Sequence, residues 1–459
     1  MCHRGQMTTD AVTNPYLAGN FAPIDHETTA VDLPVAGTLP EALDGRLLRI
    51  GPNPVAPVDP ATHHWFTGTG MVHGVRLRGG RAEWYRSRYV RSDTVTQTLG
   101  WPAVPGPRHG MGDGTANTNV IEHAGRTLAI VEAGSLPVAL TDELETVERT
   151  DFDGTLPGSF TAHPKRDPAT GELHAVVYYW SWDTIQYVVV GTDGRVRRTV
   201  DVPVPGKPMV HDCAITKSSV LLFDLPCHFD VDAAMGGTPF PYRWNEAFAP
   251  RVGVLPREGQ ATDVRWCELD EPCYVFHPLN AYDAADGTVV VDVVRWPTIF
   301  AQDVRGPSDG PTRLERWVCD PARGTVHTDV LSDISQEFPR HDERILGRRH
   351  RFGYATVFDP DPAGGVHIGS LLKHDLDAMT TEVHDVGPAR SAMEAVFVPR
   401  DADAAEDDGW VLAYVHDAER NACDVVILDA QDFTGDPVAT LHLPVRVPYG
   451  FHGNWVPSA

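Results

Sequence analysis

The sequence predicts an all-β protein built as a propeller of seven four-stranded blades, and three observations predict this fold class. Short runs rich in Val, Ile, Tyr and Trp recur along the whole chain. Turn residues separate these runs, with 41 Gly and 38 Pro in 459 residues. Helical periodicity is scarce. A single open sheet of this size would leave long unpaired edges, whereas seven blades of about 65 residues each, loops included, protect them.

The strand-like runs follow one another at short intervals, and several come directly after hairpin turns such as DPATGE (167–172) and AADGT (284–288). The clearest runs are 126–134, 172–182, 218–225, 287–296, 409–417 and 423–430. Two segments, 93–100 and 138–148, are expected to be short helices in insertions. The Pro/Gly-rich segment 101–114 is expected to be a long loop, and 401–409 (DADAAEDDG) a solvated acidic turn.

The composition shows no low-complexity linker and no abrupt shift, so we expect one domain over residues 1–459. Residues 1–44 form an N-terminal extension and the start of the propeller in this interpretation. Sequence repeats are not visible at the blade period, so the propeller is inferred from strand spacing and edge protection.

Charge and cysteine content exclude several classes of function. The chain has 38 Lys and Arg against 63 Asp and Glu, a formal net charge of −25, which argues against a nucleic-acid partner. No run approaches the roughly 18 apolar residues of a transmembrane helix. The first residues, MCHRGQMTTD, lack the apolar stretch of a secretory signal. The seven scattered cysteines, without a CxxC pair, indicate free thiols and a cytoplasmic location.

Four of the 21 histidines stand out by their local sequence, because each lies at the end of a short apolar stretch beside Pro, Gly or Asp. They are His163 (FTAHPK), His211 (MVHDCAIT), His277 (YVFHPLNAY) and His452 (YGFHGNW). Their separations of 48, 66 and 175 residues correspond to about one, one and three blades. Four imidazoles at strand ends could therefore converge on the propeller axis and bind Fe, Zn, Cu or Ni. The alternative is that each is an ordinary core or turn residue.

A histidine that binds a metal usually donates its other ring N–H to a carboxylate. Three acidic residues lie in apolar, strand-like segments where such a partner is expected: Glu132 (LAIVEAGSLP), Glu394 (SAMEAVFVPR) and Asp424 (ACDVVILDA). Their alternative interpretation is a carboxylate at a strand end or in a turn.

At these residues the sequence resembles the carotenoid cleavage oxygenase family, which includes carotenoid-, apocarotenoid- and stilbene-cleaving enzymes. The resemblance runs in order from about residue 45 to the C-terminus. It is carried by RIGPNP (49–54), FTGTGMVHG (66–74), YRSRYVRS (85–92), GTANTNV (114–120), FTAHPK (160–165), VHDCAIT (210–216), HPLNAY (277–282), RFGY (351–354), EAVFVPR (394–400), DDGWVLAYV (407–415) and GFHGNWVP (450–457).

The resemblance implies a seven-bladed β-propeller capped by a dome of loops and short helices over the metal-bearing face. It implies one Fe(2+) per chain, held by His163, His211, His277 and His452, with Glu132, Glu394 and Asp424 orienting three of the rings. Asp424 stands where the family usually has Glu, so its shorter side chain would need a closer backbone or a bridging water. The implied reaction adds both atoms of O2 across one conjugated C=C bond of an apolar substrate and gives two carbonyl products.

An apolar tunnel under the dome is expected to bury the substrate, with Phe66, Val131, Phe276 and Trp455 as candidate lining residues. Stilbene-cleaving relatives typically carry a Lys at the position of Val131, so its absence favours a carotenoid or apocarotenoid. Thr67 is a second departure, because the family commonly has Asp after the Phe of this motif.

Three alternatives stay open at this stage. The same cleavage could act on a stilbenoid or phenylpropanoid alkene. The chain could be a non-catalytic binding propeller with a structural metal, although four matched histidines speak against this. It could be an isomerase, as in one membrane-bound branch of the family, whose anchoring Cys and apolar insert are not seen here. An apolar substrate also leaves open a transient contact with lipid.

Overall fold

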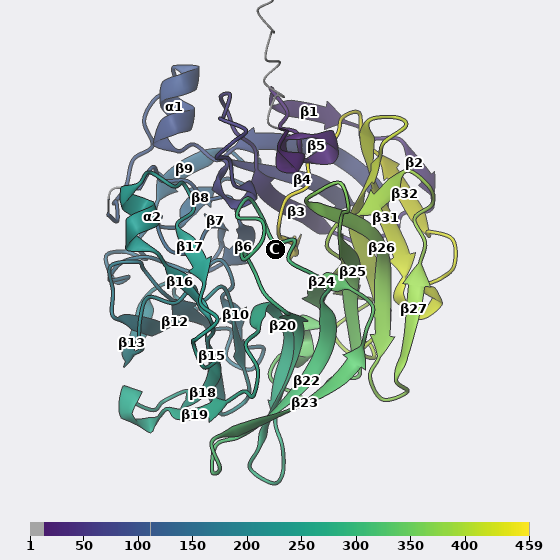
Figure 1. Cartoon of the computed structure of the whole chain (residues 1–459). Coiled ribbons are helices and arrows are strands. Elements are labelled where there is room, and N and C mark those ends of the chain that lie inside the picture. Colours follow the sequence, from purple (N-terminus) through teal and green to yellow (C-terminus); the bar gives the residue numbers. More distant parts are fainter. Residues whose placement is uncertain (1–12, 111, 459) are drawn as a thin grey trace, which may run out of the picture.

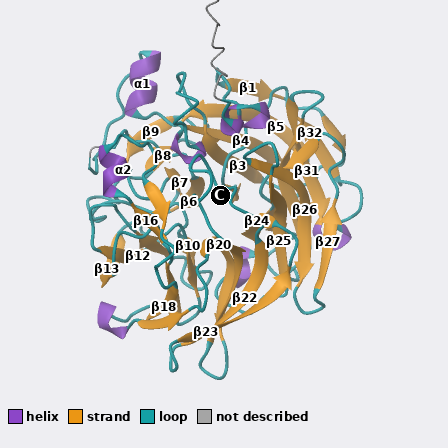
Figure 2. Cartoon of the chain, viewed as in Figure 1, coloured by secondary structure: helices purple, strands orange, loops and turns teal. Residues whose placement is uncertain are grey.

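Strands dominate the structure, a computed structural model that describes residues 13–110 and 112–458. They form sheets arranged radially around a central axis, and the ring is traversed in chain order from purple to yellow (Figure 1). Helices are few and short among the described residues (Figure 2). The prediction of an all-β, seven-bladed propeller is confirmed.

Blades 2 to 6 are each four antiparallel strands, successive in the chain apart from one hairpin insertion in blade 4. Blade 2 holds β6 (Asn119–His123), β7 (Arg126–Ile130), β8 (Val138–Leu140) and β9 (Thr146–Arg149), and blade 3 holds β10 (Lys165–Arg166), β11 (Leu173–Val177), β12 (Thr184–Val190) and β13 (Val196–Pro203). Blade 4 holds β14 (Cys213–Ile215), β15 (Ser219–Asp224), β18 (Arg251–Pro256) and β19 (Arg265–Glu268). Blade 5 holds β20 (Tyr274–Asp283), β21 (Val289–Trp296), β22 (Arg313–Asp320) and β23 (Thr325–Ser332). Blade 6 holds β24 (Gln336–Arg340), β25 (Phe352–Pro360), β26 (Val366–Asp375) and β27 (Thr380–His384). The outer strands β19 and β23 also touch through one parallel bridge, which joins blades 4 and 5.

Blades 1 and 7 close the ring, because each combines strands from both ends of the chain. Blade 1 has the order β1 (Thr28–Val31), β5 (Arg81–Tyr89), β4 (Gly70–Arg78), β3 (Gly45–Pro52) and β33 (Gly453–Pro457). Blade 7 has β28 (Arg390–Ala392) and β29 (Val396–Pro399) beside β30 (Gly409–Asp417), followed by β31 (Ala422–Asp429), β32 (Ala439–His442) and β2 (Val35–Gly37). The antiparallel pairs β3–β33 and β2–β32 therefore tie the two ends together twice.

The strand sequences reflect position within a blade. Strands such as β15 and β21 are buried on both faces and read as nearly continuous apolar runs. The outer strand β13 alternates between buried and more exposed residues, as expected where one face meets water. The apolar runs in the sequence therefore predicted such buried strands correctly, for example β15 and β21.

The two predicted helices had different outcomes. The helix expected over 93–100 is confirmed as α1 (Asp93–Leu99), capped by the Ser92 side chain and ended by Gly100 at φ 68°. The helix expected over 138–148 is wrong, because this segment forms the hairpin β8–β9. Its buried β8 packs into the blade core, and Leu144 turns the chain at φ 68°, so tertiary packing overrides the helix-favouring DELE sequence.

Segments inserted between strands form the predicted cap over one end of the axis. They carry η3 (Trp65–Thr67), β16 (Cys227–Phe229), α2 (Val231–Met235) and β17 (Tyr242–Trp244). The cap segments contact one another: the Trp65 amide donates to the Arg305 carbonyl at 2.8 Å, and His64 stacks on Phe240 with ring centroids 4.0 Å apart.

Six of the seven cysteines are free, as predicted, and the structure shows that these six are buried; Cys2 lies outside the described residues. No helix in the described part of the chain has the length and apolarity to cross a bilayer.

The tight β3–β33 closure predicts the effect of Gly453→Ala. A Cβ at Gly453 would overlap the carbonyl oxygen of Leu48, which the strand pairing holds in place. We expect Gly453→Ala to lower the free energy of unfolding by about 1–3 kcal/mol, as overpacking typically does. The matched control is Gly236→Ala at the exposed end of α2, where a Cβ meets only ordinary contacts. Urea denaturation of both variants measures the difference, and equal midpoints would contradict the predicted overlap.

Candidate metal centre

Four histidines from four different blades meet on the propeller axis. His163 and His211 lie two residues before the innermost strands β10 and β14, His277 lies within β20, and His452 directly precedes β33. The Nε2 atoms of His163 and His211 are 3.1 Å apart, and those of His211 and His277 are 3.2 Å apart. Four ligand atoms, one from each ring, lie within 4.8 Å of one another, and all four residues are buried. The predicted spacing of one, one and three blades is thus confirmed.

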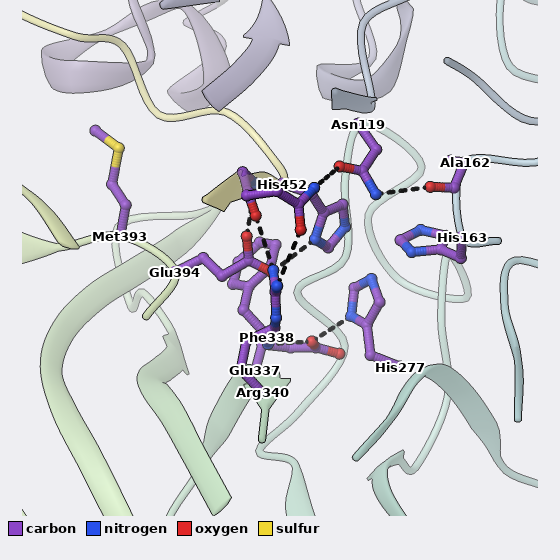
Figure 3. Close-up of polar contacts among 12 residues, drawn as sticks. Asn119, Ala162, His163, His277, Glu337, Phe338, Arg340, Met393, Glu394 and His452 are labelled. Carbon is purple, nitrogen blue, oxygen red and sulfur yellow. Dashed lines mark hydrogen bonds and ion pairs between the residues drawn. The ribbon is translucent and has the colours of Figure 1, made fainter. Parts of the chain in front are cut away.

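Two of the three predicted carboxylates contact these rings. Glu394 accepts from His452 Nδ1 at 2.9 Å and from the Gly453 amide at 2.7 Å (Figure 3). Glu132, which follows β7 of blade 2, places Oε2 2.9 Å from His211 Nδ1. This second contact is close but less well aligned than a standard hydrogen bond.

The prediction that Asp424 orients one of the four imidazole rings is wrong. Asp424 lies on β31, the third strand from the axis in blade 7, and its carboxylate accepts from His442 Nδ1 at 2.8 Å and from the Arg390 side chain at 2.6 Å and contacts none of the four rings. The residue that holds the third ring is Glu337 on β24, whose Oε2 lies 2.6 Å from His277 Nδ1 (Figure 3).

Glu337 is held rigidly, because every neighbour of its carboxylate is a donor. Trp296 Nε1 donates to Oε1 at 2.7 Å, and the Phe338 amide donates to Oε2 at 2.6 Å. The sequence did contain a signal for this residue. Glu337 stands immediately before Phe338 in the gap of 175 residues between His277 and His452, where only Glu394 and Asp424 were predicted to be partners of the rings.

Burial and the carboxylates determine the protonation of the rings. Burial holds the pKa of His163 well below its usual value and lowers the pKa of His452 to about 4 despite Glu394. Burial also disfavours the charged form of His211, but Glu132, with Asp212 and Glu337, outweighs it, so the pKa of this ring is raised. Burial opposes ionisation of Glu394, but Arg340 and His452 outweigh it and lower the pKa of this carboxyl to about 2.

This arrangement fits a metal ion. A carboxylate on Nδ1 fixes the proton there and leaves the lone pair on Nε2, which faces the axis. Several imidazole lone pairs this close repel one another unless a cation lies between them. His163 is the exception among the four, since its Nδ1 is 3.8 Å from Asp212, whose same oxygen binds Lys165 at 2.8 Å. The donor set of four imidazoles suits a first-row transition metal.

On the cap side, the metal centre opens into a cavity of about 350 Å³, bordered by His211, His277 and His452. Its other walls are mainly aromatic and apolar, the composition of a site for an apolar ligand. We call it the apolar cavity. Three of the predicted lining residues, Phe66, Val131 and Phe276, border it.

Trp455 does not line the apolar cavity, which corrects the prediction. It lies on β33 and borders a second cavity of about 380 Å³. We call this the axial polar cavity, since the innermost strands of blades 1 to 6 and many charged side chains surround it. The reason is position along the chain: Phe451, before His452, borders the apolar cavity, whereas Trp455 follows His452 on β33 and lies on the other side of the metal centre.

Sequence reasoning also missed several aromatic residues of the apolar cavity, namely Phe240, Phe338, Phe358 and Phe451. Phe338 and Phe451 adjoin Glu337 and His452 in the sequence, which was a usable signal. Thr67, which departs from the family pattern, borders the cavity and donates through Oγ1 to the His64 carbonyl at 2.8 Å.

Comparison with known proteins agrees with this geometry. The family described as retinal pigment epithelial membrane protein (RPE65) matches residues 21–457. A carotenoid cleavage oxygenase of Mycobacterium tuberculosis is 46% identical, covering 97% of this chain and 98% of the relative. A carotenoid 9,10(9′,10′)-cleavage dioxygenase 1 of Arabidopsis thaliana is 34% identical, covering 96% of this chain and 89% of the relative.

Solved structures show the same similarity. The crystal structure of the Pseudomonas brassicacearum lignostilbene dioxygenase has a TM-score of 0.88 and 32% identity, covering 97% of this chain and 99% of that one. A cobalt-substituted Synechocystis apocarotenoid oxygenase has a TM-score of 0.83 and 26% identity, covering 95% and 97%. The four-histidine centre, the propeller and the full-length similarity together show that this chain is an enzyme of the carotenoid cleavage oxygenase family, the non-haem iron dioxygenases.

Proposed function

We propose that this enzyme binds one Fe(2+) per chain through His163, His211, His277 and His452 and cleaves a conjugated C=C bond of a carotenoid or apocarotenoid with O2. The products are two carbonyl compounds, each with one oxygen atom from O2. The observation that carries the proposal is the position of the four buried nitrogens at the inner end of an apolar, aromatic cavity. The residues 1–459 act as a single catalytic domain in this proposal.

The ligand set supports iron in its reduced state. Four neutral imidazoles leave a dication its full charge, and they leave coordination positions free. Iron bound there would supply the site at which O2 reacts with the alkene. Glu132, Glu337 and Glu394 act on the rings and not on the substrate, because they hold Nδ1–H and so aim Nε2 at the axis.

The remaining residues of the apolar cavity position the substrate and exclude water. Phe66 packs edge-on against Phe276, Phe300 and Phe451, with ring centroids 5.4–6.0 Å apart, so its ring is held beside the metal centre. A rigid aromatic wall fixes one double bond of a flat polyene near the metal. We assign no general acid or base, since the reaction as written transfers no proton.

The cavity wall favours a carotenoid or apocarotenoid. Val131 borders the cavity with an apolar side chain at the position next to Glu132. The relative with 46% identity is a carotenoid cleavage oxygenase. Trp180 at the edge of this cavity, together with Val231 and Met235 on α2, exposes apolar surface that supports brief contact with lipid as a source of such a substrate. The buried free thiols support a cytoplasmic location.

The second candidate is the same cleavage of a stilbenoid or phenylpropanoid alkene. It is favoured by the TM-score of 0.88 to a lignostilbene dioxygenase. The hydroxyl-bearing Tyr178 and Tyr242 in the cavity wall offer polar partners for a phenol.

The test is anaerobic purification with metal analysis, followed by turnover of two substrate panels, apocarotenals and hydroxystilbenes, under ¹⁸O2. We expect about one iron per chain, bound by the four-histidine site. We also expect paired carbonyl products from apocarotenals, each with one ¹⁸O atom. Products from hydroxystilbenes alone would establish the second candidate. Well-folded protein that binds iron but yields no cleavage product from either panel would refute the proposal.

Glu337→Gln is expected to weaken metal binding. The three hydrogen-bond partners of the carboxylate are donors, so the amide NH2 of Gln must face one of them, and the uncharged amide oxygen that remains is a weaker acceptor for His277 Nδ1–H. Loss of such a partner lowers metal affinity about 10–100-fold. Competition with a chelator of known affinity, using Co²⁺ under argon, measures the change. The matched control is Asp424→Asn, which disturbs only the pair with His442 and the arginines. Weaker binding in the control and not in Glu337→Gln would contradict the assignment.

Val131→Lys is expected to change substrate preference. An ammonium group in the apolar cavity disfavours a hydrocarbon chain and offers a partner to a phenol. We expect the ratio of kcat/KM for an apocarotenal to that for a hydroxystilbene to fall by about 10-fold or more, as one misplaced polar group commonly causes. Val131→Met, apolar and of similar length, is the control. An unchanged ratio in Val131→Lys would show that this position does not select the substrate.

A further inference from the structure

The metal centre lies between two cavities of opposite character. His277 and His452 border both the apolar cavity and the axial polar cavity. The proposed function uses only the apolar cavity. The axial polar cavity has no role in it, although it reaches the same imidazole rings from the opposite side.

The walls of the axial polar cavity carry four carboxylates and three cationic side chains. Lys165 pairs with Asp212 at 2.8 Å, and Arg340 is shared by Glu394 at 3.2 Å and Glu343 at 2.6 Å. Glu122 lies 3.7 Å from Arg166, so every carboxylate of this passage has a cationic neighbour, and the lining keeps a formal excess of one negative charge. An apolar alkene is excluded from such a lining, whereas a hydrated cation finds polar groups to replace its water.

The four carboxylates of the cavity differ in their exposure to solvent. The side chains of Glu343 and Glu122 are 62% and 37% exposed, whereas those of Asp212 and Glu394 are only 2% exposed. The two exposed carboxylates thus lie where solvent reaches the cavity. Exposed carboxylates at an opening raise the local concentration of cations and speed their capture.

A buried imidazole with one unpartnered ring nitrogen borders the same cavity. His341 is 8% exposed, and its Nε2 has no hydrogen-bond partner among the described residues. Burial holds the pKa of His341 well below its usual value, so the ring is neutral and has a lone pair to offer. A neutral imidazole binds divalent transition metals well. Because it offers only one coordination bond, it would hold such an ion only briefly.

The apolar cavity is a poor route for the same ion. Its walls are mainly aromatic, and bringing a dication through them without polar partners is costly.

We propose that the axial polar cavity is the loading route by which a hydrated divalent transition-metal ion reaches the four histidines, with Glu122 and Glu343 attracting it and His341 binding it in transit. This inference rests on the proposed metal centre. It is independent of the substrate and of the cleavage reaction.

The experiment measures metal uptake and not turnover. Protein stripped with a chelator is mixed with Co²⁺ in a stopped-flow instrument, and the visible absorption of the bound ion is followed; Fe²⁺ is tested the same way anaerobically with a quenching chelator. The variants are His341→Leu and the double variant Glu122→Gln/Glu343→Gln. The control is Val131→Phe, which narrows the apolar cavity.

We expect uptake to be several-fold slower in His341→Leu. It should be about tenfold slower in the double variant at low ionic strength, with the difference disappearing in high salt. Val131→Phe should take up metal at the wild-type rate. Once loaded to equilibrium, His341→Leu and the double variant should hold as much metal as the wild type and turn over substrate equally fast.

Equal uptake rates in all variants would overturn the inference, and so would slow uptake in Val131→Phe alone, which would place the route on the apolar side. If His341→Leu fails to fold, the double variant at exposed positions decides by itself. Wild-type protein that takes up about one Co²⁺ per chain but cleaves no alkene would refute the proposed function and leave this inference standing. Wild-type protein that takes up no metal would refute both.

Discussion

The contact between a carboxylate and an imidazole Nδ1–H is the interaction on which the rest of the site depends. It occurs three times, at Glu132, Glu337 and Glu394, and each time it turns a lone pair toward the axis. Every blade contributes one group to this centre. Blades 1, 3, 4 and 5 give the histidines, and blades 2, 6 and 7 give the carboxylates. The radial fold is therefore the device that brings seven distant residues together, and no single blade could hold the metal.

The two cavities on either side of the metal centre differ in the polarity of their walls, as their different ligands require. The cap adds aromatic residues above the histidines, while the innermost strands below them present charged and amide side chains. This division arises because inserted loops supply the upper walls, whereas alternation along innermost strands such as β6 and β10 supplies the lower ones. An oxidation in which an apolar alkene meets a metal cation needs an apolar wall for the alkene and a polar wall for the cation.

Much of the fold and the ligand set could be predicted from the sequence. The motifs that carry the family resemblance placed His163, His211, His277 and His452 correctly, and their separations of about one, one and three blades agree with strands that repeat at regular intervals around an axis. The segment 138–148 was missed, because its helix-favouring residues form the turn of a hairpin whose pairing depends on distant strands.

The prediction of Asp424 in place of Glu337 was wrong for a similar reason. Apolar neighbours identified Asp424 as buried, which it is, but they do not tell an innermost strand from the third strand of the same blade. The cavity walls were predictable only beside the motifs. Phe240 reaches the cavity from a cap segment whose path depends on its contacts with other loops, such as the stacking on His64.

The closure of the ring through β3 and β33 links assembly of the fold to assembly of the metal centre. His452 directly precedes β33, the strand that follows all others in chain order, so the fourth imidazole arrives only when strands from opposite ends of the chain have paired. Pairing between such remote segments is slow, because much chain entropy is lost before any contact forms. An ion bridging the histidines of blades 1, 3, 4 and 5 favours the closed ring by mass action. Metal supply would thus govern how long a newly made chain lasts before degradation, as well as whether it is active.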